Sequence, residues 1–163
     1  MPTPEAVIDL SIAVPHVREA LDVMPRSFAE YSLKGEPAGV MLETVESLHA
    51  EMAGGRRIAV GRVDGRIVAA AKHYEASDGS WYFGRLAVLP EARGRGLAAA
   101  LVRALRVEAR ARGLAGLSCT VRAGEPGNIA IYEHLGMRVV TRGERRSLTG
   151  AIMPVVDMAD APA

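Results

Sequence analysis

The sequence has little that would cross-link the chain or anchor it in a membrane. Its one cysteine, Cys119, excludes a disulfide within the chain and is typical of a reducing compartment. No apolar run reaches the roughly 18–20 residues that a membrane-spanning helix needs. The first residues also lack the basic-then-apolar order of a signal peptide. We therefore expect a cytoplasmic protein with no membrane partner.

An excess of charge of one sign is also absent. The chain carries 20 basic and 19 acidic side chains, a net charge of +1, so its charge does not imply a general affinity for nucleic acid or anionic lipid. Aromatic residues make up only 4%, but hydrophobic residues reach 49%, which is enough to build a core and excludes a disordered chain. With 163 residues and neither a repeat nor a linker, we expect a single domain over residues 1–163.

The first third of the chain predicts a strand over residues 6–14 and then two helical segments. Pro15 suits the first position of a helix, which Pro25 must end or kink. A short turn through Phe28 and Tyr31 and a loop at residues 34–39 follow. Thr44 is expected to cap the next helix, which Gly54 and Gly55 stop.

Strand-like periodicity then replaces the helical pattern. Arg57–Val63 and Arg66–Tyr74 flank the hairpin dipeptide Asp64-Gly65, and Trp81–Leu89 makes a third antiparallel strand. A long helix is expected over residues 97–112, with Arg103, Arg106 and Arg110 facing away from its apolar stripe. Further strands are expected over residues 114–121, 137–142 and 151–158, with a short helix over residues 126–135. The order predicts a mixed α/β (α+β) layer, not a doubly wound parallel sheet.

A glycine–arginine loop, residues 93–98, lies between the third strand and the long helix. Gly94 and Gly96 allow a ligand to approach the backbone, and the first amides of the helix have no partner within it. Together with the helix dipole, they form a cradle for a pyrophosphate, to which Arg93 and Arg95 add positive charge. The alternative is a basic turn that only links strand to helix.

Two other phosphate-binding motifs fit less well. A P-loop needs Lys-Ser or Lys-Thr after its last glycine, whereas this chain has Leu97-Ala98. A dinucleotide-binding fold matches Gly94-x-Gly96-x-x-Ala99, but it requires an acidic residue in the next strand. The segment of residues 114–121 has none, so dinucleotide binding is disfavoured.

Two segments resemble a known family. Residues 86–98, LAVLPEARGRGLA, resemble the signature motif of the GNAT (N-acetyltransferase) acyltransferase superfamily, whose core is Arg/Gln-x-x-Gly-x-Gly/Ala. Residues 127–137, GNIAIYEHLGM, resemble its second motif. The resemblance implies a central mixed sheet, mostly antiparallel, with a splayed parallel pair and flanking helices. It also implies acetyl-CoA as co-substrate and no metal.

The resemblance assigns roles to particular residues. The backbone of Leu86, Ala87 and Val88 is expected to bond the pantetheine arm, and Tyr132 to protonate the departing thiolate. The expected pyrophosphate ligands are the amides of Arg93, Gly94, Arg95, Gly96, Leu97 and Ala98. Many relatives carry a coenzyme-contacting asparagine seven residues before the tyrosine. Glu125 occupies that position here, and the sequence leaves open whether Glu125 or Asn128 takes the role.

The general base is not apparent. The branch that acetylates ribosomal-protein amino termini has a glutamate where this chain has Thr120, which makes that branch a poorer match. Glu43, His73 and Glu75 are the remaining candidates, and each also fits a surface or capping role.

Several other polar residues suggest no site. His16, His49 and His134 have no metal spacing, and Cys119 fits a buried apolar position. The arginines at 142, 145 and 146 predict a basic hairpin loop that is solvated or meets a phosphate or an acidic acceptor.

Two functions are therefore expected in order. The first is an acetyl-CoA-dependent N-acetyltransferase that acts on an amine of a small molecule or peptide, by direct attack in a ternary complex. The second is a non-catalytic acyl-CoA sensor with the same fold. Relatives are often dimers, so a homodimer is also considered. The sequence does not identify the acceptor.

Overall fold

The computed structural model describes residues 6–23, 44–146 and 150–161. The predicted turn through Phe28 and Tyr31, the loop at 34–39 and the candidate base Glu43 lie outside these residues. Within the described part, no helix is long and apolar enough to cross a membrane.

One sheet of seven strands forms the centre of the described structure, in the order β1-β2-β3-β4-β5-β7-β6. The strands are β1 Val7–Asp9, β2 Arg57–Val63, β3 Arg66–Glu75, β4 Trp81–Val88, β5 Leu117–Arg122, β6 Met137–Arg146 and β7 Ile152–Asp160. All neighbours pair antiparallel except β4 and β5, which are parallel. The predicted mixed, mostly antiparallel sheet is confirmed.

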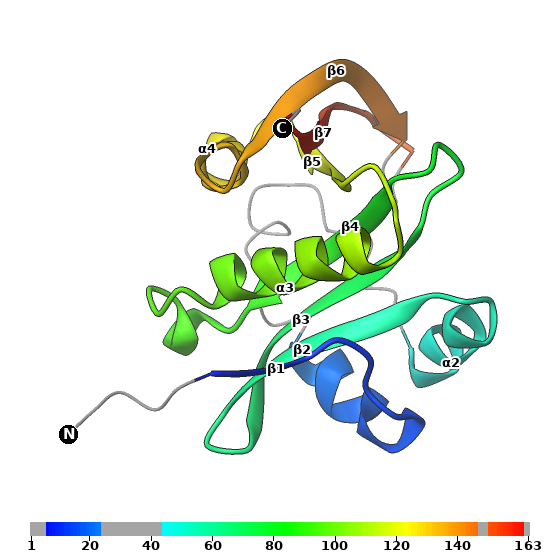
Figure 1. The fold of residues 1–163 in the computed structure, drawn as a ribbon, viewed down its shortest axis with the longest axis vertical. Helices are drawn as coiled ribbons and strands as arrows, with labels where there is room; N and C mark the ends of the chain where they lie inside the picture. The colour runs from blue at the N-terminus through cyan, green and yellow to red at the C-terminus, as the bar shows by residue number, and fades with distance from the viewer. Residues whose placement is uncertain (1–5, 24–43, 147–149, 162–163) are drawn as a thin grey trace.

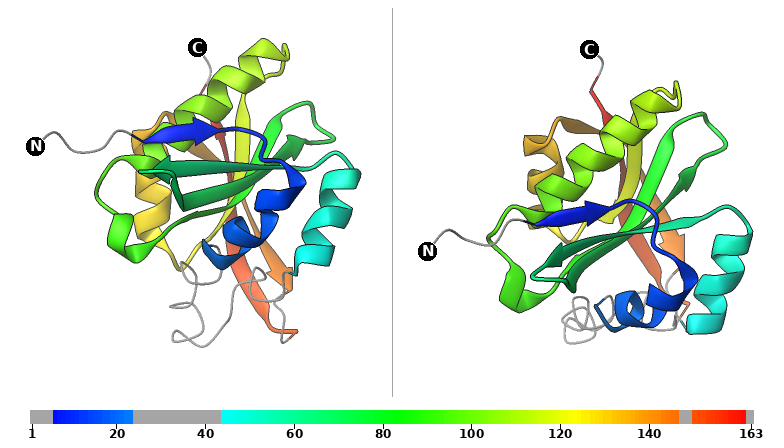
Figure 2. Two further views of the ribbon diagram at one scale, coloured as in Figure 1. Left: turned by 90° about the horizontal axis from the view of Figure 1, so that it is seen from below. Right: turned by 60° about the horizontal axis from the view of Figure 1, so that its bottom comes forward.

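Helices cover both faces of this sheet (Figure 2). α3 (Leu97–Ala111) and α4 (Pro126–His134) lie on one face, and the helical residues 17–23 and α2 (Val45–Ala53) on the other. Thr44 caps α2 through a reciprocal bond pair with Ser47, as predicted. α3 buries the expected stripe of Leu97, Leu101, Val102, Leu105 and Ala109 against the core.

The parallel strands β4 and β5 separate soon after they begin. They pair only at Trp81 with Leu117 and at Tyr82 with Ser118. Beyond these positions the sheet divides, with β5, β7, β6 and α4 on one side and β4, β3, β2 and β1 on the other (Figure 1). The β3–β4 register also shifts between Ala70 and Lys72, a bulge that bends the strand. The resulting V between β4 and β5 is the splayed pair that the family resemblance implies.

Several predicted boundaries are wrong. The first strand ends at Asp9, not residue 14, because the Asp9 carboxylate accepts a bond from the Ser11 amide and turns the chain. β5 starts at Leu117, since Gly116 has a φ of +131° that breaks the extended backbone. β6 continues to Arg146 because it pairs with β7 along its length. The three arginines at 142, 145 and 146 are therefore strand residues and not a hairpin loop.

Arg106 is a further correction. It was expected to face away from the core with Arg103 and Arg110, but its side chain is only 18% exposed. The guanidinium bonds both carboxylate oxygens of Asp160 at the end of β7, at 2.6 and 3.1 Å. The neighbours Arg103 and Arg110 are exposed, as predicted.

Candidate functional site

The glycine–arginine loop forms an open backbone cradle at the start of α3. Gly94 and Gly96 have φ values of +81° and +75°, in the left-handed region that favours glycine. A Cβ atom added at either glycine would meet no protein atom within 4 Å. The first helical bond runs from the Ala100 amide to the Gly96 carbonyl, so the three amides before Ala100 do not serve the helix. They suit an anion, which the helix dipole also favours.

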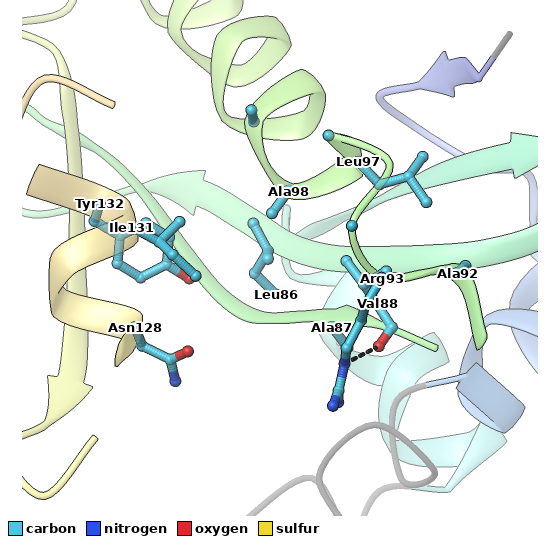
Figure 3. A pocket seen from close by; sticks show the side chains of 13 residues that line it. Leu86, Ala87, Val88, Ala92, Arg93, Leu97, Ala98, Asn128, Ile131 and Tyr132 are labelled. Carbon is cyan, nitrogen blue, oxygen red and sulfur yellow. Dashed lines mark hydrogen bonds between the residues drawn. The ribbon is translucent and has the colours of Figure 1, made fainter. Parts of the chain in front are cut away.

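A cleft of about 440 Å³ extends from this loop across β4 to α4. Figure 3 shows the loop at one end, Asn128, Ile131 and Tyr132 of α4 at the other, and Leu86 between them. Of the residues that the resemblance assigned to the donor or to thiolate protonation, all but Arg95 line this cleft. The side chain of Arg95 is exposed at the tip of the loop and does not line it.

Three lining residues were missed from the sequence. They are Ala92, Ala99 and Ile131. Ala92 and Ala99 directly flank the loop segment that was predicted. Ile131 is adjacent to Tyr132 in the sequence, and this adjacency was the available signal that it could line the site. Its side chain is 46% exposed, so it does not serve the core.

The backbone at the end of β4 is directed into the V. The Leu89 amide donates to the Val68 carbonyl of β3 at 2.9 Å. Because successive residues of a strand point their polar groups to opposite sides, the amide and carbonyl of Val88 point away from β3. The Arg93 Nε–H donates to that Val88 carbonyl at 3.3 Å, which holds the guanidinium along the cleft (Figure 3).

Tyr132 lies against the buried side of β4. Its ring contacts Phe83 edge-on, with centroids 5.5 Å apart and an interplanar angle of 78°. Phe83 is 1% exposed, so this contact fixes the tyrosine ring against the core. The phenol oxygen points across the cleft toward Leu86 (Figure 3). The position is suited to proton donation at the end of the cleft away from the anion cradle.

The structure distinguishes between Asn128 and Glu125 by position. Asn128 lines the cleft with its amide directed into it (Figure 3), whereas Glu125 precedes α4 and does not line it. Asn128 and Tyr132 are four residues apart on one helical face, as their spacing predicts.

His73 is not a base in this cleft. Its side chain is 0% exposed, and its Nδ1 accepts a bond from the Trp81 indole N–H at 3.1 Å. Nε2 therefore carries the proton and donates it to the Leu10 carbonyl at 2.6 Å. Burial lowers the pKa of His73 below its ordinary value, in agreement with a neutral ring. Both nitrogens are committed to the core, which contradicts the candidate role.

Glu75 does not reach the cleft either. It ends β3 opposite Trp81, the first residue of β4, whereas the cleft begins near the end of β4 at Leu86. The side chain lines a different, polar cavity beside Arg56 and Arg57.

Cys119 is a core residue, as predicted. It is 3% exposed, and burial, with smaller contributions from the charges of Asp157 and Asp160, raises the pKa of its thiol to about 12. A thiol in this state is unreactive. Among the described residues, no group of three or more histidine, cysteine, aspartate or glutamate side chains is arranged to hold a metal ion.

The sequence also matches a known protein family whose fold agrees with this geometry. Residues 22–137, well over half of the chain, match the model of the Acetyltransferase (GNAT) family. The chain belongs to the GNAT acetyltransferase family. Among curated proteins, no sequence matches it.

Solved structures share the GNAT fold over almost the whole chain. The ribosomal-protein-S18-alanine N-acetyltransferase of Escherichia coli has a TM-score of 0.75 at 22% identity, over 98% of this chain and 96% of its own. The ribosomal-protein-alanine N-acetyltransferase of Brucella melitensis has a TM-score of 0.77 at 19% identity, over 96% of this chain and 99% of its own. The yncA protein of Salmonella typhimurium, solved with acetyl-CoA, has a TM-score of 0.75 at 15% identity, over 98% of this chain and 96% of its own. At these identities the likeness concerns the fold.

Proposed function

We propose that this GNAT protein transfers the acetyl group of acetyl-CoA to an amine by direct attack in a ternary complex. One observation carries the proposal: a single cleft joins an anion cradle at Gly94 and Gly96 to the phenol of Tyr132. Between them, the β4 backbone offers polar groups to the cleft. A phosphorylated, extended donor with a thioester at its far end matches this order of groups.

Each part of the cleft has a task in this reaction. The loop amides and Arg93 hold the pyrophosphate, and the backbone of Val88 bonds an amide of the pantetheine arm. The bound donor supplies an activated acetyl carbon. Tyr132 donates its proton to the sulfur as the thiolate departs, which typically accelerates such a step by about 10²–10⁴-fold.

The first test is Tyr132→Phe. We expect it to lower kcat by roughly 10²-fold or more, because the proton donor is lost, and to leave acetyl-CoA affinity nearly unchanged. Affinity is measured by calorimetric titration, and turnover by release of free thiol over a panel of spermidine, lysine and short peptides with free amino termini. Tyr74→Phe is the matched control, since Tyr74 is half-buried and lies outside the cleft.

The outcomes separate the proposals. Unchanged turnover in Tyr132→Phe would remove Tyr132 from the reaction. Wild-type binding of acetyl-CoA without transfer to any amine would favour the acyl-CoA sensor. Absence of binding would exclude both functions.

The acceptor is proposed only as an amine of a small molecule or peptide. Two of the structural neighbours are named for acetylating an alanine of a ribosomal protein. In this chain, Thr120 stands where that branch carries glutamate, so the proposal does not extend to the same substrate.

A further inference from the structure

A hydrogen-bonded carboxylate lies at the centre of the β5-β7-β6 half of the sheet. Asp157 of β7 is directly opposite Thr120 of β5 and Thr141 of β6. Its Oδ1 accepts a bond from the Thr120 hydroxyl at 2.7 Å, and its Oδ2 accepts one from the Thr141 hydroxyl at 2.9 Å. Asp157 is half-buried, and no ion pair joins it to another side chain in the described part of the molecule.

This carboxylate faces away from α3 and α4. Leu117, Cys119 and Val121 of β5 are buried in the core, on the face of the sheet that α3 covers. Thr120 alternates with them and points to the opposite face, and directly paired residues of neighbouring strands share a face. Asp157 therefore lies on the face away from Tyr132, with the V between the two strands connecting the faces.

Thr120 is at the wall of that V. Ser118 is the last residue of β5 that pairs with β4, and Thr120 lies two residues further, roughly 7 Å along the strand. The opposite wall is β4, whose residues from Leu86 to Val88 line the donor cleft. Thr120 does not itself line the donor cleft, but an amine that enters the V from the Asp157 face would pass it on the way to Tyr132.

The proposed function needs a proton acceptor at this point. An alkyl amine with a pKa of about 10.4 is protonated at neutral pH and cannot attack until it loses a proton. His73 is closed off in the core, and Glu75 lies outside the cleft. A carboxylate beside the V supplies what these candidates do not.

The hydrogen bonds of Thr120 set the direction of transfer. Its hydroxyl proton is committed to Asp157, and one of its two lone pairs accepts a bond from Arg145 Nη2 at 3.2 Å. The other lone pair has no donor within the described residues. An ammonium N–H placed there would complete a chain from the nitrogen through Thr120 to Asp157.

We propose that Asp157, acting through the hydroxyl of Thr120, takes the proton of the acceptor ammonium; the proposal rests on the transferase function above. The nitrogen proton passes to Thr120 Oγ1 while the proton of Thr120 passes to Asp157. The freed lone pair forms the N–C bond at the acetyl carbon. The C–S bond then breaks, and its electrons go to the sulfur, which is protonated by Tyr132. The second nitrogen proton restores Tyr132 through solvent, and Asp157 releases its proton, so one proton is released per turnover.

The test is Asp157→Asn, which keeps the shape of the side chain and removes the base. We expect kcat to fall by about 10²-fold or more with the best amine of the panel, and acetyl-CoA affinity and the melting temperature to change little. Asp9→Asn is the matched control. Asp9 lies on β1, in the other half of the sheet, and kcat of this variant should equal that of the wild type.

A rescue variant separates a chemical role from a structural one. Adding Thr120→Glu to Asp157→Asn places a carboxylate on the directly opposite residue, at the wall of the V. We expect kcat of the double variant to be at least tenfold higher than that of Asp157→Asn. A structural role for Asp157 would not be relieved by a carboxylate on β5.

The results that overturn the proposal are distinct. Wild-type kcat in Asp157→Asn, or a loss of kcat that the double variant does not relieve, overturns the role of Asp157 and leaves the transferase function intact. Absence of transfer by the wild type itself overturns the transferase function, and the role of Asp157 falls with it.

Discussion

At the scale of single residues, His73 makes stability depend on pH in a defined direction. Burial lowers the pKa of His73 below its ordinary 6.5. The unfolded chain, with an ordinary histidine, therefore binds a proton at a pH where the folded protein does not. The free energy of unfolding is highest above pH 6.5 and falls below it, by up to ~1.4 kcal/mol per pH unit, until the folded ring is also protonated.

Denaturant unfolding of the wild type and His73→Gln between about pH 5 and 7 measures this effect. The other titrating groups are common to both proteins, so the stability advantage of the wild type should shrink as the pH falls. A difference that stays constant over this range would show that His73 takes up no proton on unfolding.

Gly96 allows backbone strain to be separated from ligand binding. Gly96 and Gly113 both have positive φ values, +75° and +70°, and a Cβ at either would meet no protein atom within 4 Å. Alanine at each position should lower the free energy of unfolding by about 1–2 kcal/mol. Only Gly96→Ala should also weaken acetyl-CoA binding, by about tenfold or more (~1.4 kcal/mol), because its Cβ enters the cradle.

Calorimetric titration and urea unfolding of the two variants test this prediction. Equal acetyl-CoA affinities in Gly96→Ala and Gly113→Ala would place the pyrophosphate elsewhere.

The residues of the loop could be predicted from sequence because their signals are local. Gly94 and Gly96 mark positive φ angles, and the helix that follows them has a clear apolar stripe. The role of Asp157 could not be predicted, because its partners Thr120 and Thr141 come from two other strands. Only the register of β5, β7 and β6 brings the three side chains together.

At the scale of elements, Asp160 joins α3 to the second half of the sheet. Its carboxylate accepts bonds from Arg106 of α3 and from the Leu117 amide at the start of β5. Arg106 also donates to the Leu135 carbonyl after α4, at 2.7 Å. The two ionic side chains are only 18% and 14% exposed, so each depends on the other as its counterion.

Asp160→Ala should therefore lower the free energy of unfolding by about 3 kcal/mol, because it leaves Arg106 partly buried without its counterion. Glu108→Ala is the control: Glu108 pairs with Arg112 one turn away on the same helix, and its loss should cost about 0.5 kcal/mol. Urea unfolding measures both. Similar losses in the two variants would mean that the Asp160 junction adds nothing beyond a surface ion pair.

Elements that are specified by local sequence were predicted well, and features that depend on distant partners were not. The hairpin of β2 and β3 was predicted to within one residue, because Asp64-Gly65 and the apolar runs that flank this turn specify it locally. The length of β6 and the inward position of Arg106 were not. β6 is extended by its pairing with β7, and the partner of Arg106 lies 54 residues away in sequence.

At the scale of the whole molecule, the division of the sheet leaves backbone groups of β4 without a neighbouring strand. The Val88 amide points into the V, whereas the Leu89 amide bonds the Val68 carbonyl at 2.9 Å. A pantetheine arm in the V would pair with the first and leave the second unchanged.

Hydrogen exchange measured residue by residue tests this arrangement. We expect saturating acetyl-CoA to slow exchange of the Val88 amide by tenfold or more relative to any change at Leu89, since a new hydrogen bond forms only at Val88. Leu89 serves as the internal control, because general stabilisation by the ligand slows both amides together. Equal slowing would mean that the ligand stabilises the fold without bonding β4. In that case the donor would be held by the loop alone, and the separation of β4 and β5 would serve only to admit it.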